Sequence, residues 1–271
     1  MTSTERLTFA PKMFTAGDWY DAPHIEPGGR VDVRLLTWNA WFGGHMFDER
    51  CDALLVELQR RRPDIIALQE VTQALLRALL AEPWIRAAYQ VSQCEVLSYD
   101  VVILSRLPIR RIAELALPTE MGRRLLVAEL ACGLAVATVH LESTREEAAT
   151  RAAQLRIIQP VLAARYGDVV LVGDMNFQPD DPLENAALDP AFLDAWPAVH
   201  PDDPGHTVDT DINTMRLQVR STPTHKRIDR VFLRSSHWRA RSIELIGTRP
   251  FDDEGTFISD HFGLETVLAA T

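Results

Sequence analysis

The segment Val169-Val170-Leu171-Val172-Gly173-Asp174-Met175-Asn176 joins a continuous apolar run to a carboxylate and an amide. Its run of β-prone apolar residues predicts a strand that is buried on both faces, and Gly173 allows the backbone to turn or a ligand to approach closely. If Asp174 and Asn176 stay extended, their side chains point the same way at the end of the strand. The stretch therefore predicts a carboxylate and an amide side by side at the edge of a sheet, although both are also ordinary turn residues.

The size and composition of the chain, 271 residues with 46% hydrophobic and 24% charged residues, are those of a globular protein. Because α/β domains often reach about 250 residues as one unit, we expect one domain over 31–271, preceded by an extended arm over 1–30. No apolar run approaches the roughly 18 residues that a membrane span needs, and the N-terminus lacks the apolar region of a signal peptide. We therefore expect no membrane partner.

The cysteines and the charges narrow the class of protein further. Cys51, Cys94 and Cys132 are odd in number and widely spaced, which argues against a disulfide framework and a cysteine-bound zinc and favours a cytoplasmic location. The net charge of −10 argues against a non-specific nucleic-acid binder. Residues 216–241 nevertheless hold eight Lys and Arg residues around one acid, Asp229. Such a segment is either a solvated face or a surface that receives an anion.

Periodicity predicts an alternation of strands and helices, with a run of hairpins in the middle of the chain. Helices are expected over 48–62, 72–80 and 146–165. Strands are expected over 33–38, 65–68, 101–104, 110–115, 124–130, 134–140, 169–176, 227–233, 242–246 and 262–268, with a loop-rich region over 177–226. Helices between strands together with hairpins favour an α/β sandwich with mixed sheets over a parallel barrel.

Polar side chains stand at the ends of these expected strands. They are Asn39, Glu70, His140, Asp174, Asn176, Asp229 and the pair Asp260-His261. Each alone is more often a turn residue, a capping residue or a satisfied buried histidine. Turns use glycine and proline as often as these polar residues, so the repetition of polar side chains at strand ends indicates a site. In α/β proteins, sites are built where strands end at one edge of a sheet.

The residue types in this set point to a metal. The carboxylates of Glu70 and Asp260 and the amide oxygen of Asn39 are hard oxygen ligands, which suit Mg²⁺ with Mn²⁺ as a substitute. They differ from the thiolate-rich or histidine-rich sets that zinc prefers. We therefore expect a magnesium site that includes these three residues.

The remaining members of the set fit the other parts of a hydrolytic reaction. Asp174 is suited to orient and deprotonate a water, and Asn176, His140 and His261 are donors for charge that develops on phosphate oxygens. Asp229 favours the imidazolium form of His261. Together these roles describe metal-assisted hydrolysis of a phosphoester.

Five short motifs, in this order, resemble those of the endonuclease/exonuclease/phosphatase superfamily. They are Thr37-Trp38-Asn39, Gln69-Glu70-Val71, Gly173-Asp174-Met175-Asn176, Ile228-Asp229-Arg230 and Ser259-Asp260-His261. The resemblance covers about 31–271. It implies a DNase I-like fold, which is a four-layer α/β/β/α sandwich with two mixed sheets.

Within the superfamily, residues 140–145, 207–210 and 257–264 resemble the 5′-tyrosyl-DNA phosphodiesterase branch. In that branch an aromatic residue usually precedes the Asp-Thr pair of the second segment, where this chain has Val208. The branch implies hydrolysis of a phosphodiester at the 5′ end of DNA with a tyrosyl-type leaving group, so that the partner is a nucleic-acid 5′ end that can carry a linked protein. We expect the enzyme to be a monomer.

The resemblance also implies a role for each matching residue. Glu70 is the principal Mg²⁺ ligand, with Asn39 near the metal and the phosphate. Asp174 is the base with Asn176 as its partner, and His140 and His261 stabilise the transition state. Ser143 and Arg145 bind the phosphate or the strand 3′ to it, and Asp229 and Asp260 support His261 and the metal.

Other functions remain open at this point. A general DNA repair endonuclease or exonuclease, or an RNA phosphodiesterase, would have the same fold. A lipid or inositol phosphate hydrolase and an inactive binding module are further alternatives. A binuclear metallophosphoesterase is excluded because it needs an Asp-x-His ligand pair, and none of the eight histidines has Asp two residues before it.

Overall fold

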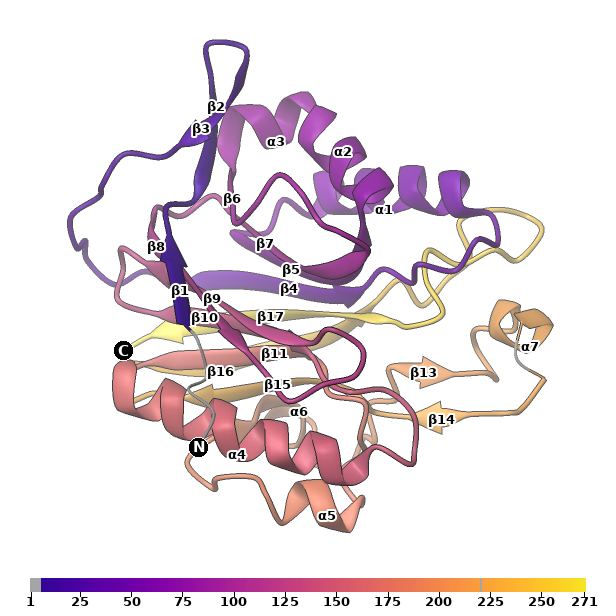
Figure 1. Cartoon of the computed structure of the whole chain (residues 1–271). Coiled ribbons are helices and arrows are strands. Elements are labelled where there is room, and N and C mark those ends of the chain that lie inside the picture. The colour runs from indigo at the N-terminus through magenta and orange to yellow at the C-terminus, as the bar shows by residue number, and fades with distance from the viewer. Residues whose placement is uncertain (1–5, 220) are drawn as a thin grey trace.

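Two β-sheets pack face to face in the computed structural model, which describes residues 6–219 and 221–271 (Figure 1). The eight-stranded sheet has the order β16 (Trp238–Ile246), β17 (Gly263–Ala270), β4 (Val33–Asn39), β5 (Ile65–Thr72), β7 (Tyr99–Ser105), β6 (Gln90–Val91), β2 (Lys12–Thr15) and β3 (Asp18–Asp21). The seven-stranded sheet has the order β1 (Arg6–Phe9), β8 (Ile109–Ala116), β9 (Arg124–Leu130), β10 (Ala135–His140), β11 (Val169–Asp174), β15 (Asp229–Arg234) and β12 (Leu193–Asp194). Both sheets are mixed, because β4 pairs with β5, and β10 with β11, in parallel.

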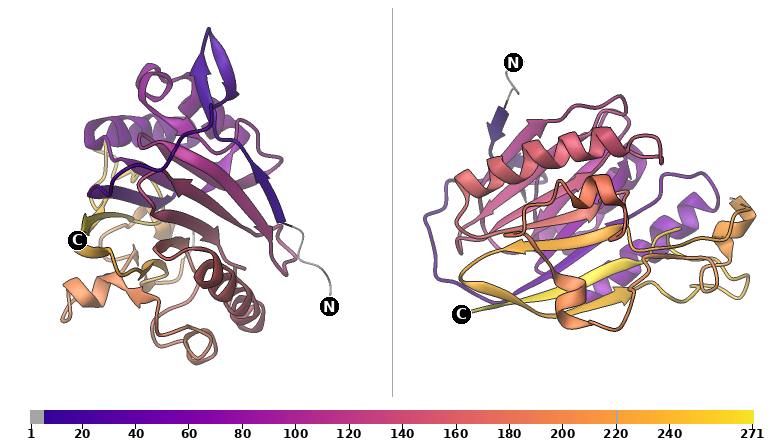
Figure 2. Two further views of the ribbon diagram at one scale, coloured as in Figure 1. Left: turned by 90° about the vertical axis from the view of Figure 1, so that its left-hand side faces the viewer. Right: turned by 90° about the horizontal axis from the view of Figure 1, so that it is seen from below.

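Helices cover the outer face of each sheet. The eight-stranded sheet carries α1 (Phe47–Arg61), α2 (Gln73–Ala81) and α3 (Pro83–Ala88), and the seven-stranded sheet carries α4 (Ala148–Arg165) and α5 (Pro182–Asn185). Figure 2 shows α4 running along the outer face of its sheet. The short helix α6 (Ala195–Val199) lies against β15 and β16, at the edges of the two sheets. The predicted four-layer α/β/β/α sandwich is therefore confirmed.

The apolar stretch over 169–172 occupies the middle of these layers, as predicted. Val170 and Val172 face the core between the two sheets, whereas Val169 and Leu171 face the core beneath α4. All four side chains are buried. Burial on both faces explains why the sequence shows a continuous apolar run here and no alternation.

Two local expectations for this stretch are wrong. Gly173 has a φ of +130°, and a Cβ built there would lie 2.1 Å from the carbonyl oxygen of Val139 in β10. Glycine is thus needed for the close approach of a neighbouring strand and not of a ligand. Asn176 is not extended, because its φ is +55° and its backbone N–H donates to Oδ1 of Asp174 at 2.9 Å. The strand ends in a turn that brings the two side chains together.

The expected arm over 1–30 is in part regular structure. Its strand β1 pairs with β8, and β2 pairs with β6, so the segment adds strands to both sheets. A two-residue turn at Ala16 (φ +50°) and Gly17 (φ +91°) joins β2 to β3, and positive φ at both positions is the geometry that a tight hairpin favours. Trp19 packs on the core beneath α1–α3, as expected for an arm that buries its aromatic residues. Residues 1–5 lie outside the described residues.

The region over 177–226 contains short elements joined by long connections. Beyond α5, β12 and α6, a two-stranded ribbon of β13 (Val208–Asp209) and β14 (His225–Lys226) projects from the sandwich, and α7 (Met215–Val219) lies at its tip (Figure 1). Among the described residues, no helix combines the length and the apolar character that crossing a bilayer requires.

Replacing Gly173 tests the close contact between β10 and β11. The variant Gly173→Ala should lose about 2 kcal/mol or more of unfolding free energy, because the new methyl group meets a backbone carbonyl and φ is unfavourable for alanine. Gly255→Ala is the matched control: φ there is +82°, but the added Cβ would meet nothing within 4 Å. Urea denaturation measures both, and equal losses for the two variants would show that the Val139 contact has no special cost.

Candidate active site

Side chains from three strands of the seven-stranded sheet lie in one transverse row. His140 of β10 is the register partner of Asp174 in β11, and Asp174 is the register partner of Asp229 in β15. Because partners in register point to the same face of a sheet, the three side chains emerge together. The strand ends predicted from the sequence therefore meet at one edge of the sandwich.

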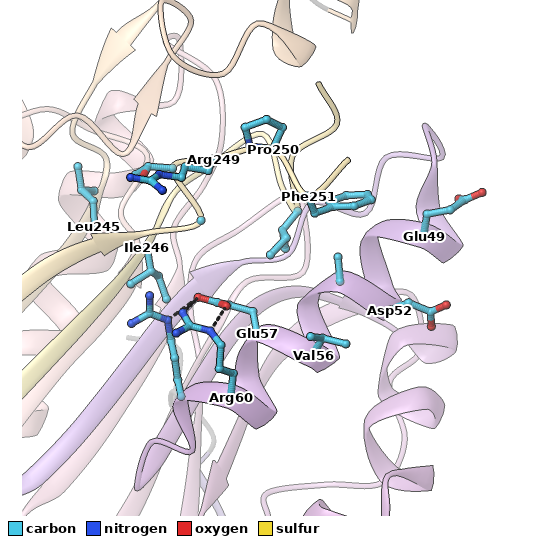
Figure 3. Close-up of a pocket in the computed structure, with 15 residues that line it drawn as sticks. Glu49, Asp52, Val56, Glu57, Arg60, Leu245, Ile246, Arg249, Pro250 and Phe251 are labelled. Atoms are coloured by element: carbon cyan, nitrogen blue, oxygen red, sulfur yellow. Dashed lines mark hydrogen bonds and ion pairs between the residues drawn. The ribbon is translucent and has the colours of Figure 1, made fainter. Parts of the chain in front are cut away.

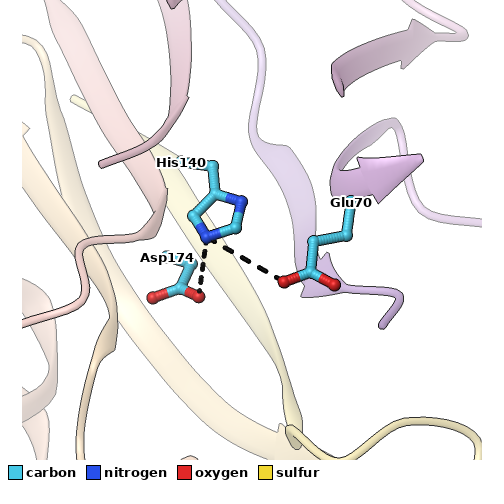
Figure 4. A group of neighbouring side chains, drawn as sticks. All are labelled: Glu70, His140 and Asp174. Carbon is cyan, nitrogen blue, oxygen red and sulfur yellow. Dashed lines mark ion pairs between the residues drawn. The ribbon is translucent and has the colours of Figure 1, made fainter. Parts of the chain in front are cut away.

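The eight-stranded sheet contributes Glu70 to the same place. One oxygen of Glu70, one of Asp174 and a ring nitrogen of His140 all lie within 4.8 Å of one another. Nε2 of His140 is 3.4 Å from Oδ2 of Asp174 and 4.0 Å from Oε1 of Glu70 (Figure 4). The site thus lies between the two sheets and belongs to both.

Glu70 reaches this position through a β-bulge. The expected strand over 65–68 continues to Thr72, and the register with β7 shifts between Leu68 and Val71. Glu70 lies within the shift and has a φ of +58°, a conformation that costs a residue other than glycine about 1 kcal/mol or more. Bulges re-aim a side chain, and here Glu70 accepts a hydrogen bond from the backbone N–H of Phe42 at 2.9 Å.

Asn39 joins the two sheets. Its Nδ2 donates to Oε1 of Glu70 at 3.0 Å and to Oδ2 of Asp174 at 2.9 Å, whereas its Oδ1 accepts from the backbone N–H of Trp41 at 2.9 Å. The N–H of Trp41 fixes this orientation of the amide, because the opposite one would place two donors together. The structure therefore turns the nitrogen of Asn39, and not the oxygen predicted as a metal ligand, toward the carboxylates.

His261 is held in its charged form. Its Nδ1 lies 2.8 Å from Oδ2 of Asp229, and both side chains are buried. Burial alone would lower the pKa of His261, but the charges of Asp229 and Asp260 outweigh it and raise this pKa to about 10. The pairing that the sequence suggested places an imidazolium beside Asp174.

His140 is held in the opposite state. Burial, together with the charges of Arg123 and His261, lowers the pKa of His140 well below its usual value. A guanidinium nitrogen of Arg123 lies 3.0 Å from Nδ1 of His140. Since guanidinium only donates, Nδ1 must accept and the proton of the neutral ring must sit on Nε2. This N–H faces Asp174.

The carboxyl groups favour a divalent cation between them. Burial and the charge of Asp229 raise the pKa of Asp174 to about 7, and burial raises the pKa of Glu70. Asp229 also has a buried oxygen, Oδ1, without a hydrogen-bond partner among the described residues. Crowded oxygen ligands with high pKa values and an unused acceptor nearby are the set that a hard cation such as Mg²⁺ neutralises. These residues therefore fit the expected metal, with Glu70 and Asp174 as the carboxylates nearest to each other.

Of the three predicted substrate-binding residues, Asn39 and Ser143 lie in the site and Arg145 does not. Oγ of Ser143 lies 3.5 Å from Nε2 of His140 and 3.4 Å from Nδ2 of Asn176. Arg145 is exposed and forms no hydrogen bond or ion pair with any other described residue. Asp260 lies beside the site, where it pairs with Arg216, and its Oδ1 is 3.9 Å from Nε2 of His261.

Arg123 and Tyr99 were not predicted and are part of the site. Arg123 is only 7% exposed and donates to Oγ of Ser143 at 2.8 Å, and its guanidinium lies 5.2 Å from the ring centroid of Tyr99. Tyr99 in turn stacks on Phe42, with 4.6 Å between ring centroids. Hairpin geometry was a usable signal for Arg123, because the start of the strand over 124–130 must lie beside the end of the strand over 134–140, where His140 stands.

Of the basic residues considered for an anion-receiving surface over 216–241, several form ion pairs within the fold. Arg227 and Arg230 both pair with Asp194, at 2.6 and 2.7 Å, and Arg216 pairs with Asp260. Arg234 donates to backbone carbonyls. Arg220 lies outside the described residues. The fold therefore already engages several of the basic side chains of this segment in ion pairs or hydrogen bonds.

A hollow of about 780 Å³ lies elsewhere, between α1 and the connection from β16 to β17 (Figure 3). Its lining includes Val56, Glu57, Ile246 and Phe251 and none of the residues described above. A much smaller hollow of about 10 Å³ lies among Tyr99, Arg123 and His140. Chemistry and not size identifies the candidate active site, because carboxylates and histidines whose pKa values are raised or strongly lowered by burial and by one another gather between the sheets.

The variant Asp229→Asn should lower the pKa of His261, because it removes the largest charge that raises it. Since the folded pKa lies above the unfolded value of about 6.5, this pair stabilises the fold fully below about pH 6.5 and is lost as the pH rises through about 10. NMR titration of the imidazole measures the shift, with the exposed Asp253→Asn as the control for charge alone. An unchanged pKa in Asp229→Asn would mean that another group holds the proton.

Comparison with known proteins places this geometry in a family. A family profile described as Endonuclease/Exonuclease/phosphatase family matches residues 36–261. Tyrosyl-DNA phosphodiesterase 2 of Mus musculus is 29% identical over 249 residues, which cover 87% of this chain. The human protein of the same name is 29% identical over 245 residues, which cover 85%. The chain spans 66% of the length of each of these curated relatives.

Solved structures show the same fold. The structure of Danio rerio TDP2 complexed with a single-strand DNA product has a TM-score of 0.79 and 24% identity and covers 88% of this chain and 98% of that one. The human Nocturnin catalytic domain with bound sulfate has a TM-score of 0.66 and 19% identity and covers 89% and 94%. Since the family profile spans most of the sequence and includes every strand end of the site, the chain belongs to the Endonuclease/Exonuclease/phosphatase family.

Proposed function

We propose that this protein is a Mg²⁺-dependent phosphodiesterase that acts at a 5′ end of DNA and prefers a tyrosyl-type leaving group. The observation that carries the proposal is the pair of carboxylates, Glu70 and Asp174, which Asn39 holds together between a neutral and a charged histidine. In the transition state of phosphoester hydrolysis, negative charge develops on the phosphoryl oxygens. The neutral His140 can donate a hydrogen bond to these oxygens, and the cationic His261 can balance their charge.

In the proposed reaction, Asp174 orients the attacking water and takes its proton. A base works best when its pKa is near the working pH, and the pKa of Asp174 is raised to about 7. His261 and the N–H on Nε2 of His140 hold the phosphoryl oxygens, on which charge develops. Glu70 would hold Mg²⁺, which supplies Lewis-acid stabilisation of the same charge.

The position of Arg123 favours an aryl leaving group. Its guanidinium lies beside His140 and Ser143 and over the ring of Tyr99, so it adds a cation and an aromatic wall at one side of the site. A phenoxide, whose conjugate acid has a pKa of about 10, leaves more easily than an alkoxide. An aryl group can stack on the aromatic wall, and its developing charge would face the guanidinium.

The similar proteins support the DNA substrate. Curated relatives carry the name tyrosyl-DNA phosphodiesterase 2, and TDP2 of Danio rerio has been crystallised with a single-strand DNA product. A general nuclease with the same fold is the competing function, and the substrate comparison below separates the two. The expectations of a monomer and of a cytoplasmic location stay predictions.

Activity should depend on a divalent cation bound by Glu70. EDTA should abolish turnover and Mg²⁺ should restore it, and Glu70→Gln should weaken Mg²⁺ binding about tenfold or more because a charged ligand is lost. Part of its defect should therefore be recovered at high Mg²⁺. The exposed Glu254→Gln is the control for loss of charge. Coincident Mg²⁺ titrations of wild type and Glu70→Gln would assign Glu70 a structural role.

Substrate comparison tests the leaving group and the roles of two arginines. A 5′-tyrosyl oligonucleotide should show a higher kcat/KM than an abasic duplex or an inositol phosphate. Arg123→Ala should slow both this substrate and p-nitrophenyl thymidine 5′-phosphate, because it removes a cation from the reacting centre.

Arg145→Ala serves as the matched variant, since Arg145 is exposed and outside the hydrogen-bonded site. It should weaken only the oligonucleotide and flatten the salt dependence, by a slope of about 0.7 for one phosphate contact on a single strand. The proposal fails if the tyrosyl substrate is not the best of the three, or if Arg123→Ala leaves kcat unchanged.

A further inference from the structure

A second group of potential metal ligands lies outside the candidate active site, on the ribbon formed by β13 and β14. One ligand atom each from Asp209, Asp211 and His225 lies within 4.8 Å of the other two. His206 stands next to them, with its Nδ1 3.7 Å from Oδ2 of Asp209. The ribbon itself creates this arrangement, because Asp209 and His225 are direct partners across its two strands.

The separations between donors suit a single tetrahedral ion. Nε2 of His225 lies 3.0 Å from Oδ2 of Asp211 and 3.5 Å from Oδ1 of Asp209. Bonds of about 2.1 Å from a tetrahedral Zn²⁺ to nitrogen or oxygen put neighbouring donors roughly 3.4 Å apart. The separations between these side chains therefore need only small adjustments to surround one ion.

An ordinary ion pair explains less of the geometry. One imidazole nitrogen of His225 faces two carboxylates, although a single hydrogen bond would use only one of them. The second histidine, His206, lies nearest to the other carboxylate oxygen of Asp209, and the two imidazole rings have their centroids 5.8 Å apart. Two carboxylates and one divalent ion would balance in charge, which removes the repulsion between Asp209 and Asp211.

We propose that His206, Asp209, Asp211 and His225 form a binding site for a transition-metal ion of the Zn²⁺ type. Two imidazole nitrogens and two carboxylate oxygens are a zinc-type donor set. They differ from the oxygen-rich surroundings of Glu70, which suit Mg²⁺. The two sites would therefore select different ions.

The ribbon and the connection that follows it contact the active site, so a metal bound to the ribbon would also affect the position of active-site residues. Next to His206, Oγ of Thr207 accepts hydrogen bonds from the backbone N–H groups of Ile228 and Asp229, at 3.2 and 3.1 Å. Beyond Asp211, Nδ2 of Asn213 donates to the carbonyl oxygen of Ser259 at 2.8 Å. The same connection carries Arg216, which pairs with Asp260. A metal that fixes the ribbon thus holds the segment that contacts Asp229 and the loop of Asp260.

Zn²⁺ binding to the full chain tests the proposal directly. After EDTA treatment and removal of the chelator, isothermal titration and native mass spectrometry should show that His225→Ala binds one equivalent less than wild type, or binds it at least tenfold more weakly. His237→Ala is the matched control: His237 also pairs with a carboxylate, Asp168, at 2.9 Å, but with no second one among the residues that the structure describes. It should bind Zn²⁺ as wild type does. Identical isotherms for wild type and His225→Ala would overturn the proposal and leave an ordinary ion pair.

A second variant keeps the test decisive if His225→Ala does not fold. His225→Cys replaces the imidazole with a thiolate, which also binds Zn²⁺ and Co²⁺. It should retain the equivalent of metal, show a sulfur-to-cobalt charge-transfer band with Co²⁺, and gain in Tm when Zn²⁺ is added, since a ligand of the folded state stabilises it. Absence of both the band and the gain in Tm would equally contradict the site. Neither readout depends on catalytic activity, so the result is independent of the proposed phosphodiesterase function.

Discussion

The two hydrogen bonds from the buried amide of Asn39 to Glu70 and Asp174 are the interaction on which the rest of the site depends. They cross from one sheet to the other, at 3.0 and 2.9 Å, and hydrogen bonds to charged groups contribute about 1.5–3 kcal/mol each. Two buried carboxylates repel each other, so this region lowers the stability of the fold unless a donor or a cation separates them. The apolar core between the sheets holds the carboxylates in place despite that repulsion.

Register within the seven-stranded sheet then determines the chemistry. Gly173 lets β11 lie close enough to β10 for His140 and Asp174 to face each other, and Asp229 follows in the same row. The three side chains of this row differ in protonation. His140 is a neutral imidazole, Asp174 is a carboxyl group with a raised pKa, and Asp229 is the carboxylate that keeps His261 protonated. Environments that push pKa values apart are what separate acid from base roles, and here strand pairing, burial and the neighbouring charges of Arg123 and Asp260 provide them.

The sequence was informative about strand ends and much less so about how side chains turn there. Apolar runs followed by polar residues predicted a sandwich with mixed sheets and the meeting of Glu70, His140 and Asp174, because burial leaves a clear periodic signal. The four layers were implied by the resemblance to the superfamily. The sequence did not predict the bulge that aims Glu70 or the turn at Asn176, since both depend on a single positive φ. Arg123 was missed because its role arises from a neighbouring strand. The sequence also did not indicate that Asp194, more than 30 residues away, pairs with two arginines of the basic segment.

The variant Asp174→Asn tests the proposed reaction most directly. It removes the acceptor of the water's proton and a buried charge, while most contacts of the side chain remain, so cooperative unfolding should be retained. With a 5′-tyrosyl oligonucleotide and saturating Mg²⁺, single-turnover kinetics should show a rate lower by roughly 10²–10⁴, the usual contribution of a general base. A folded variant that reacts within about twofold of the wild-type rate, well short of such a loss, would contradict the assignment of Asp174 as the base.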